Sequence, residues 1–434
     1  MKLNLSLAAI LAATTFSFSS AISFSEAISS VEVDGYGRYR YDSYKEQGGN
    51  SEESHRFTSD ADFKAAFGDN FYGVIGFRYD SVDPSGTPAW ANTAKYSGAD
   101  NAENSASYFN TRQFYLGYTA LENAVDVKFG RQLVGQFFTD DIVATGLKAD
   151  FAFGAFGASV YAFDTLEHDL DTGSAGEEYG ILFSQPNAEP AKKFTDQNHL
   201  YGVSVNGNFE LNQASAIDFN AGYALLQDVY GLGFVDLGTE LGVSEGVSFN
   251  ARVQGAKSSM QGEFKDAVWV DAGTGTYNNA SPKTDVDGAT FLAAQLGVEG
   301  FGFDATAGYI SFKTEKDKSS MISFEDLGSF IVAGEDLLDY SWFEGENTAW
   351  FVAAGYTFEN VRFGVQYAKN ENKVGDNTVT IKKNVNEISA RVDYAFNKKL
   401  DFSAYYSHIE EKENSDGAQK LKNNHFRFQT IYKF

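Results

Sequence analysis

The sequence predicts an all-β fold, a transmembrane antiparallel β-barrel of about 18 strands. Apolar residues recur at every second position over many short segments, which is the period of a β-strand. Tight turns alternate along the chain with longer polar stretches. The chain is rich in Gly (42), Tyr (24) and Phe (39) but has only 5 Pro in 434 residues, which suits long paired strands and aromatic girdles.

The N-terminal 21 residues are expected to be a secretory signal peptide. Met1-Lys2 is a short basic start, residues 3–18 are rich in Leu and Ala, and Ser19-Ser20-Ala21 is a small-residue cleavage site. A membrane anchor is the alternative, but polar residues interrupt the apolar stretch, which is short for a span of about 20 residues. We expect residues 22–434 to form one barrel domain, because no linker or change of composition divides them.

The first predicted strand covers residues 31–42. Two alternating runs follow at 55–67 and 71–80, joined by the tight Gly68-Asp69-Asn70, which is a hairpin pattern. The same pattern recurs at seven further tight connections: 121–124, 154–157, 211–214, 242–246, 299–302, 359–360 and 397–399. Eight hairpins supply sixteen strands, and the first and last strands make eighteen.

Longer polar stretches separate the hairpins, at 82–108, 166–198, 258–285, 314–347, 370–384 and 410–424. The strand runs between turns and loops are about ten residues long, as is typical of tilted strands that cross an outer membrane. Short turns at one end and long loops at the other are also typical of outer-membrane barrels.

The last strand, residues 425–434, alternates strictly. Phe426, Phe428, Thr430, Tyr432 and Phe434 share one face, and the other face is mostly polar. A terminal strand that ends on Phe resembles the signal by which outer-membrane barrels are recognised for insertion. We therefore expect Phe434 and Tyr432 to direct contact with the barrel-assembly machinery. A strand of a soluble sheet is the alternative for this segment alone.

The charge is strongly acidic. Removal of the signal peptide takes away one of 34 basic residues and leaves 33 against 59 acidic residues, a net charge of −26. This balance disfavours nucleic-acid binding. A channel mouth with one sign of charge concentrates the opposite ion, so we expect a moderate cation preference.

Strand parity sorts the arginines. Eight of ten fall on the polar face of their strands, and Arg112 and Arg131 do not. An arginine facing lipid would cost about 2–4 kcal/mol at mid-membrane, so the polar face is expected to line the lumen. Closure would bring six of these arginines together as a predicted pore wall: Arg38, Arg40, Arg56, Arg78, Arg391 and Arg427. The wall would orient polar solutes, or its arginines would pair with lumen acids: Asp34, Asp60, Asp62, Asp80 and Asp393.

Several motifs spread over the mature chain resemble the Campylobacter-type major outer membrane porin family. They are Gly37-Arg38-Tyr39-Arg40-Tyr41-Asp42, Arg112-Gln113-Phe114-Tyr115-Leu116, Gly130-Arg131-Gln132-Leu133, Ala144-Thr145-Gly146, His199-Leu200-Tyr201-Gly202, Glu325-Asp326-Leu327-Gly328-Ser329, Ala333-Gly334-Glu335, Ala390-Arg391-Val392-Asp393-Tyr394, Leu400-Asp401-Phe402-Ser403-Ala404-Tyr405-Tyr406 and Ile431-Tyr432-Lys433-Phe434. The resemblance implies a homotrimeric, eighteen-stranded general diffusion porin of the bacterial outer membrane. Outer-membrane lipid and lipopolysaccharide would then surround it. The resemblance weakens after Thr139-Asp140-Asp141, where this chain is a few residues shorter.

A constriction loop is expected at residues 135–144. Position after the fifth strand and the family resemblance both indicate that this loop folds inward, which would turn Gln136, Asp140 and Asp141 toward the channel. An ordinary exposed loop is the alternative. Carboxylates of the loops are also candidates for a calcium site, because calcium prefers oxygen ligands: Asp140, Asp141, Glu325 and Asp326, with Glu335 and Asp336 nearby. A cluster of solvated acids is the simpler reading.

The sequence does not favour an enzyme. It has no cysteine, and none of its five histidines falls in a GxSxG or HExxH pattern. We expect no required cofactor. Passive diffusion of small hydrophilic solutes and ions is the expected function, and a substrate-specific channel or a surface adhesin or antigen on the same barrel is the alternative.

Overall fold

The computed structural model of the 434-residue chain describes residues 31–47, 49, 51–67, 70–82, 109–167, 182–184, 192–193, 198–262, 268–269, 285–324, 327–375, 380–413 and 419–434. The expected signal peptide lies outside these residues. Within the described ranges, no helix is both long and apolar enough to cross a bilayer.

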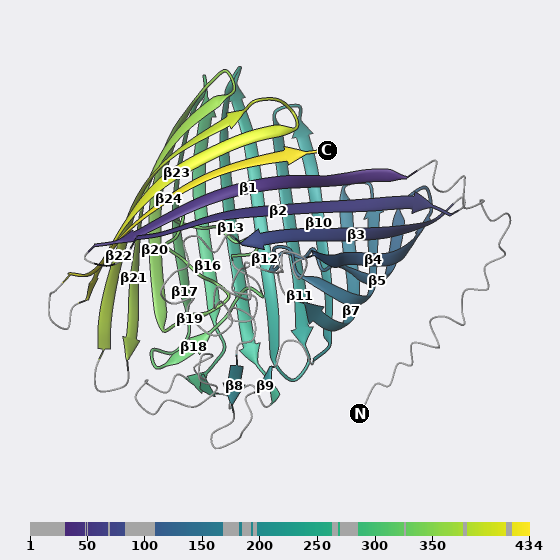
Figure 1. The fold of residues 1–434 in the computed structure, drawn as a ribbon, viewed down its shortest axis with the longest axis horizontal. Helices are drawn as coiled ribbons and strands as arrows, with labels where there is room; N and C mark the ends of the chain where they lie inside the picture. The colour runs from purple at the N-terminus through teal and green to yellow at the C-terminus, as the bar shows by residue number, and fades with distance from the viewer. Residues whose placement is uncertain are drawn as a thin grey trace.

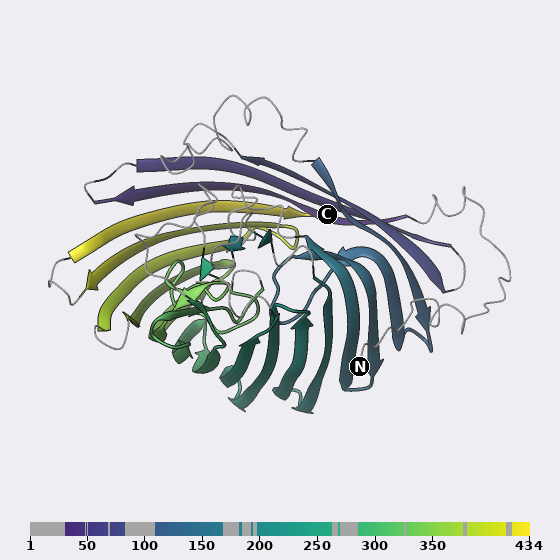
Figure 2. The same cartoon turned by 90° about the horizontal axis from the view of Figure 1, so that it is seen from below.

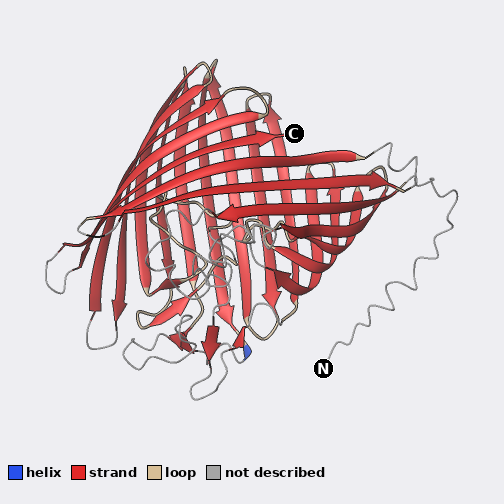
Figure 3. Cartoon of the chain, viewed as in Figure 1, coloured by secondary structure: helices blue, strands red, loops and turns tan. Residues whose placement is uncertain are grey.

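Eighteen antiparallel strands form a closed barrel (Figure 1), and strands dominate the described chain (Figure 3). Each barrel strand pairs with the next along the chain, and β1 pairs with β24 to close the sheet. The strands are β1 (Glu32–Glu46), β2 (Ser51–Ala66), β3 (Phe71–Val82), β4 (Phe109–Ala120), β5 (Val125–Leu133), β6 (Val143–Phe153), β7 (Phe156–Glu167), β10 (Leu200–Asn212), β11 (Ser215–Leu226), β12 (Tyr230–Ser244), β13 (Val247–Met260), β16 (Thr290–Gly300), β17 (Phe303–Lys313), β20 (Glu346–Phe358), β21 (Val361–Gly375), β22 (Thr380–Ala395), β23 (Leu400–Glu413) and β24 (Gln419–Lys433).

A second sheet is built from six short segments of the longer connections. These are β8 (Leu182–Ser184), β9 (Lys192–Lys193), β14 (Val268–Trp269), β15 (Asp285–Val286), β18 (Lys318–Ser320) and β19 (Phe343–Glu344). Strands β18 and β19 flank a segment that folds into the lumen of the barrel.

The predicted closure is confirmed. The register of β1 and β24 runs from Tyr36 opposite Lys433 to Glu46 opposite Asn423. The amide of Phe434 donates to the carbonyl oxygen of Gly35 at 3.1 Å. A Cβ atom at Gly35 would lie 2.2 Å from the backbone carbonyl oxygen of Asp60 and 2.8 Å from the Phe434 ring, so the close approach of β2 requires glycine at this position.

The eight predicted hairpins are all present as paired neighbouring strands. In one of them, Phe301 and Gly302 take φ values of 54° and 82°, as a two-residue type I′ turn requires. At the opposite end, residues 227–229 make a three-residue connection between β11 and β12, which was not predicted from the sequence.

Several strands are longer than the expected ten residues. Strand β22 has 16 residues and β21 has 15, so most of the polar stretch at 370–384 is strand rather than loop. The polar stretch at 410–424 is likewise mostly covered by β23 and β24. Charged and amide side chains cover these strand ends, where the apolar alternation used to recognise a membrane strand no longer holds.

The outer wall is apolar. Large hydrophobic side chains alternate outward along the strands and stay exposed, including Phe57, Phe114, Leu296, Val365 and Ile388. Lumen-facing positions carry most of the charges. The barrel thus turns its apolar face outward, as expected for a wall in contact with lipid.

Candidate functional site

Two connections fold into the lumen. The first inward segment, residues 134–142, joins β5 to β6. The second inward segment, residues 321–324 and 327–342, lies between β18 and β19. Figure 2 shows green loop segments lying between the opposing walls of strands. The first segment corresponds to the loop that was expected to fold inward, and its role as a constriction stays a prediction. The second was expected to be part of a long polar loop.

The two inward segments hold each other. The amide of Phe324 donates to the carbonyl of Phe138 at 2.9 Å, and the amide of Ser329 donates to the carbonyl of Phe137 at 2.7 Å. Gly328 has a φ of 53°, and a Cβ atom there would lie 2.9 Å from the Phe137 carbonyl oxygen. The contact between the segments therefore depends on glycine at this position.

An apolar core fixes both segments to one side of the inner wall. The ring of Phe137 stacks on Phe234 of β12 at 4.5 Å between centroids. Phe330 packs edge-on against Phe291 of β16 at 4.7 Å. Tyr340 is fully buried and donates its hydroxyl to the carbonyl of Ile331 at 2.7 Å. Burial raises the pKa of the Tyr340 phenol, so this donor keeps its proton.

Polar side chains of the same wall pin the backbone of the second inward segment. Gln254 of β13 donates to the carbonyl of Ser329 at 3.1 Å and accepts from the amide of Ile331 at 2.6 Å. Gln366 of β21 accepts from the amide of Gly334 at 3.0 Å. These bonds satisfy backbone groups that the fold has removed from water.

The six predicted pore-wall arginines lie on β22, β24, β1, β2 and β3, which follow one another in the barrel except that β23 separates β22 from β24. We call the wall formed by β22 to β24 and β1 to β4 the arginine wall. Both inward segments reach this wall through acidic side chains, at two separate places.

The first inward segment meets the wall at a buried charge cluster. Asp141 accepts from Arg78 at 2.7 Å and from Arg112 at 3.2 Å. Asp60 of β2 binds the Arg78 guanidinium through two bonds of 2.7 Å and also pairs with Arg112. Two carboxylates thus balance two guanidiniums, of which Arg78 is 1% exposed. Balanced pairing is what allows these charges to be buried.

Arg112 faces the lumen, contrary to what strand parity indicated. Its position in the alternation of β4 predicted an outward side chain, but the structure turns it into the lumen cluster. The register of β3 and β4 shifts between Gly76 and Phe77. Gln113 lies opposite Gly76 and Thr111 lies opposite Phe77, which leaves Arg112 as the extra residue of a bulge. A bulge re-aims a side chain in this way without any sign in the sequence period.

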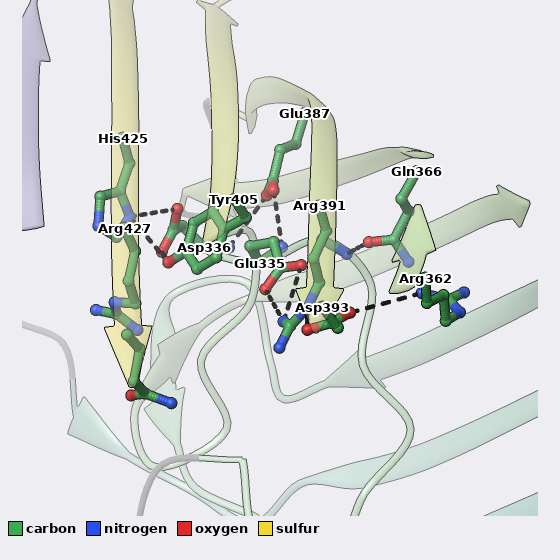
Figure 4. A network of polar contacts seen from close by, with 12 residues as sticks. Glu335, Asp336, Arg362, Gln366, Glu387, Arg391, Asp393, Tyr405, His425 and Arg427 are labelled. Atoms are coloured by element: carbon green, nitrogen blue, oxygen red, sulfur yellow. Dashed lines mark hydrogen bonds and ion pairs between the residues drawn. The ribbon is translucent and has the colours of Figure 1, made fainter. Parts of the chain in front are cut away.

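The second inward segment meets the wall at another polar network (Figure 4). Glu335 contacts Arg391 of β22 at 3.3 Å, and Asp336 lies 2.9 Å from Nδ1 of His425. Glu387 of β22 accepts from the amides of both acidic residues, at 2.7 and 3.2 Å. The segment is therefore held by its side chains and by its backbone.

His425 lies at the centre of this second contact. Its Nε2 is 2.8 Å from Asp42 of β1 and its ring stacks on Tyr44 at 3.9 Å between centroids. Asp42 also accepts from Arg427 at 2.6 Å. The histidine bridges a carboxylate of the wall and a carboxylate of the inward segment, and we call the Asp42–His425–Asp336 arrangement the histidine clasp.

The residues of the whole chain, 1–434, match the model of the Campylobacter major outer membrane protein family. The chain belongs to this family. Its fold is that of solved outer-membrane channels, which confirms the predicted barrel and places the protein in the bacterial outer membrane as a porin channel. Family and fold are those of a channel rather than of an enzyme.

Three solved structures illustrate the likeness of fold. OpdQ of Pseudomonas aeruginosa is 11% identical, with a TM-score of 0.61 over 93% of this chain and 99% of that one. OccAB4 of Acinetobacter baumannii is 12% identical, with a TM-score of 0.60 over 93% and 98%. OpdK of Pseudomonas aeruginosa, solved with vanillate, is 12% identical, with a TM-score of 0.60 over 94% and 99%. A sequence search of curated proteins gave no match.

In this member of the family, the three predicted constriction residues lie in different surroundings. Asp140 is exposed, whereas Asp141 is tied to two arginines. Gln136 is 8% exposed, and its carboxamide oxygen accepts from Ser204 of β10, so this side chain points at the wall. The expected calcium site stays a prediction: Glu325 and Asp326 lie outside the described residues, within which no group of three or more such ligands occurs.

Sequence reasoning missed several residues that position the two inward segments. Lys148 of β6 is buried and donates to the carbonyl of Val134 at 3.0 Å, at the start of the first segment. Gln254, Gln366 and Glu387 act similarly on the second segment. Their shared signal is a long polar side chain at a lumen-facing strand position, which by itself does not distinguish a backbone anchor from a water-exposed residue.

Proposed function

We propose that the barrel forms a water-filled channel for passive diffusion of small hydrophilic solutes and ions, with a moderate preference for cations. One observation carries the proposal. The inward segments fill one side of the lumen with an apolar core and contact the arginine wall through charged side chains. One contact is made on β22, β24 and β1 and the other on β2, β3 and β4, and half-buried Arg38 and Arg40 of β1 lie on the lumen face of the same wall. Polar groups would line the passage there.

The cation preference follows from how the arginines are used. Six of them are ion-paired with acidic side chains: Arg78, Arg112, Arg252, Arg362, Arg391 and Arg427. These pairs reduce the positive potential of the lumen. At the tight-turn end, a hollow of about 750 Å³ is lined by Glu240 and Glu299, which make no ion pair with any described residue. Acids at a channel mouth favour cations.

Reversal potentials in planar bilayers under a potassium chloride gradient test the ion preference. We expect the sign that indicates potassium, and a sign that indicates chloride would refute the proposal. Joint replacement of Asp140 and Asp141 by Asn should lower the preference more than joint replacement of Glu177 and Glu178 by Gln, two acids outside the described residues. Equal effects would place the narrow section elsewhere.

The same recordings separate the alternative function. A general diffusion channel should conduct in proportion to salt concentration and pass unrelated small solutes in swelling assays. Conductance that saturates and is blocked by one solute would favour a substrate-specific channel. Adhesion by the long loops would be an addition to the channel, and binding of the purified protein to host cells would test it.

Three further expectations stay with this proposal. We propose that residues 1–21 are removed, which N-terminal sequencing of the mature protein would show as a start at Ile22. We propose a homotrimer embedded in outer-membrane lipid and lipopolysaccharide, to be tested by cross-linking in detergent. We also retain calcium as a candidate ligand of the acidic loops, which calorimetry with calcium against magnesium would test.

A further inference from the structure

The outward face of β13 to β24 carries a row of lysines at its loop end. Cross-strand pairing places them side by side: Lys257 is opposite Thr290, Thr290 opposite Lys313, and Lys313 opposite Glu346. The row continues from Glu346 to Lys373 and from Lys373 to Lys382. One step nearer the barrel centre, a second row runs from Lys369 through Asn386 and Glu410 to Lys422.

We call these residues the lysine belt. Its members share outward parity with the exposed apolar side chains of the same strands and are Lys257, Lys313, Lys369, Lys373, Lys382, Lys412 and Lys422. Three outward acids, Glu346, Glu371 and Glu410, lie among the seven lysines, which leaves a net charge of +4 (seven minus three). The whole chain carries −25, so this surface has the opposite sign to the rest.

Ion pairs within the lysine belt neutralise only part of its positive charge. Glu371 pairs with both Lys373 and Lys382, at 3.1 and 3.0 Å. Glu410 pairs with Lys422 at 2.7 Å and lies 3.9 Å from Lys412. Glu371 and Glu410 are thus each shared by two lysines. The exposed Lys257 and Lys313 make no ion pair with described residues.

The depth of the belt along the barrel is set by the aromatic residues beneath it. Exposed Tyr309, Trp350, Tyr367 and Tyr406 face outward, either level with Lys369, which lies opposite Trp350, or just on the tight-turn side of the lysines. The Tyr367 hydroxyl donates to Asn386 at 3.2 Å, in the same row as Lys369. Below the aromatics the wall becomes aliphatic. Aromatic girdles mark the boundary between acyl chains and headgroups, so the lysines lie at headgroup level.

The belt covers only part of the circumference. Strands β10, β11 and β12 contain no lysine or arginine at all. The belt strands number eight, and seven spacings of about 4.8 Å make an arc of about 34 Å, enough for several lipid molecules. A basic surface of limited arc at headgroup depth indicates a binding surface rather than a general means of keeping the protein soluble.

We propose that the lysine belt binds the phosphate groups of lipids in the leaflet that surrounds the loop end of the barrel. Ammonium groups on neighbouring strands, with the amide side chains of Asn384 and Asn386 between them, offer several donors to one phosphorylated headgroup. Opposite charge is the basis of recognition, so binding weakens as ionic strength rises.

Delipidated full-length protein in neutral detergent provides the test. Native mass spectrometry would follow retention of diphosphorylated lipid A, of the same lipid with its phosphates removed, and of inorganic phosphate. We expect the wild type to retain at least ten times more phosphorylated lipid than dephosphorylated lipid. The belt variant replaces four lysines with Gln, and its retention of the phosphorylated lipid should fall at least tenfold: Lys257, Lys369, Lys412 and Lys422. A matched variant, with the same loss of charge at the tight-turn end, replaces Lys64, Lys398, Lys399 and Lys433 and should retain lipid within twofold of the wild type.

Single-channel conductance controls for folding, because the belt side chains face away from the lumen. A belt variant with unchanged conductance and lost lipid retention supports the proposal. Equal retention by the belt and control variants overturns it, as does equal retention of the dephosphorylated lipid. Displacement of the lipid by inorganic phosphate at equal concentration also overturns it, because the surface would then be a free-phosphate site. If the belt variant fails to conduct, the double variant Lys257→Gln with Lys422→Gln is judged by the same criteria.

Discussion

Replacing Asp141 with Asn should release the first inward segment from the arginine wall. The Asp141 carboxylate lies 2.7 Å from Arg78 and 3.2 Å from Arg112, and Asp60 is the other carboxylate that these two arginines share. The substitution leaves one positive charge unbalanced where the Arg78 side chain is 2% exposed. Breaking a buried ion pair costs about 3–5 kcal/mol.

The expected cost lies at the low end of that range. The Asp141 side chain is 23% exposed, so water can partly replace it. A cost of about 3 kcal/mol corresponds to a change of roughly 100-fold in the equilibrium between docked and released segment. Because the barrel keeps its strand pairing, the released population should alter the channel before it alters the fold.

Single-channel recording in planar bilayers measures this change. The Asp141→Asn channel should show higher conductance and more open-channel noise than the wild type. Asp140→Asn is the matched control, because it removes the same charge from the exposed neighbouring residue. If Asp141→Asn conducts with wild-type amplitude and noise, the charge cluster does not hold the segment and the reasoning fails.

Three other predictions concern the apolar core, the histidine clasp and the terminal strand. Phe330→Ala should remove about 3–5 kcal/mol of packing free energy from the apolar core. Proteolysis within the second inward segment should therefore increase while the barrel stays folded. Unchanged cleavage would contradict this prediction. Both ring nitrogens of His425 face carboxylates, and only the imidazolium can donate to Asp42 and Asp336 together. Open-channel noise should thus rise with pH as the imidazolium loses a proton, a dependence that His425→Gln should remove; noise that is flat with pH in the wild type would exclude it. Deleting Phe434 should leave unassembled protein in the periplasm, and normal outer-membrane levels would argue against its role as an assembly signal.

The strand count, the hairpins and the closure could be predicted because lipid and lumen impose alternate polarity on every strand. The strand ends could not. Beyond the acyl-chain region of the bilayer, both faces of β21 and β22 carry polar side chains, so residues such as Lys373 and Lys382 resemble a loop in sequence although they continue the strand pairing. Polarity reports the surroundings of a strand rather than its backbone conformation.

The channel interior was predictable only in part. The inward orientation of Arg112 was not predicted because a bulge changes which face of the strand a side chain occupies without any change in the sequence pattern. The inward fold of the second segment was not predicted because its apolar residues, such as Ile322 and Phe330, follow neither the period of a strand nor that of a helix. A long connection with its own apolar residues is the available signal, since a loop of more than about 15 residues in a compact fold is uncommon unless it has a function.

The pairing of β1 with β24 has a consequence for the order of folding. Tyr36 lies opposite Lys433, so the first strand to leave the export machinery must wait for the last before its outer edge is satisfied. Throughout that interval, the edge of β1 is a template for pairing with any other extended chain. Completion is therefore a single late event that depends on the final residues of the chain, and a nascent chain cut short at any point upstream would present an open sheet rather than a smaller barrel.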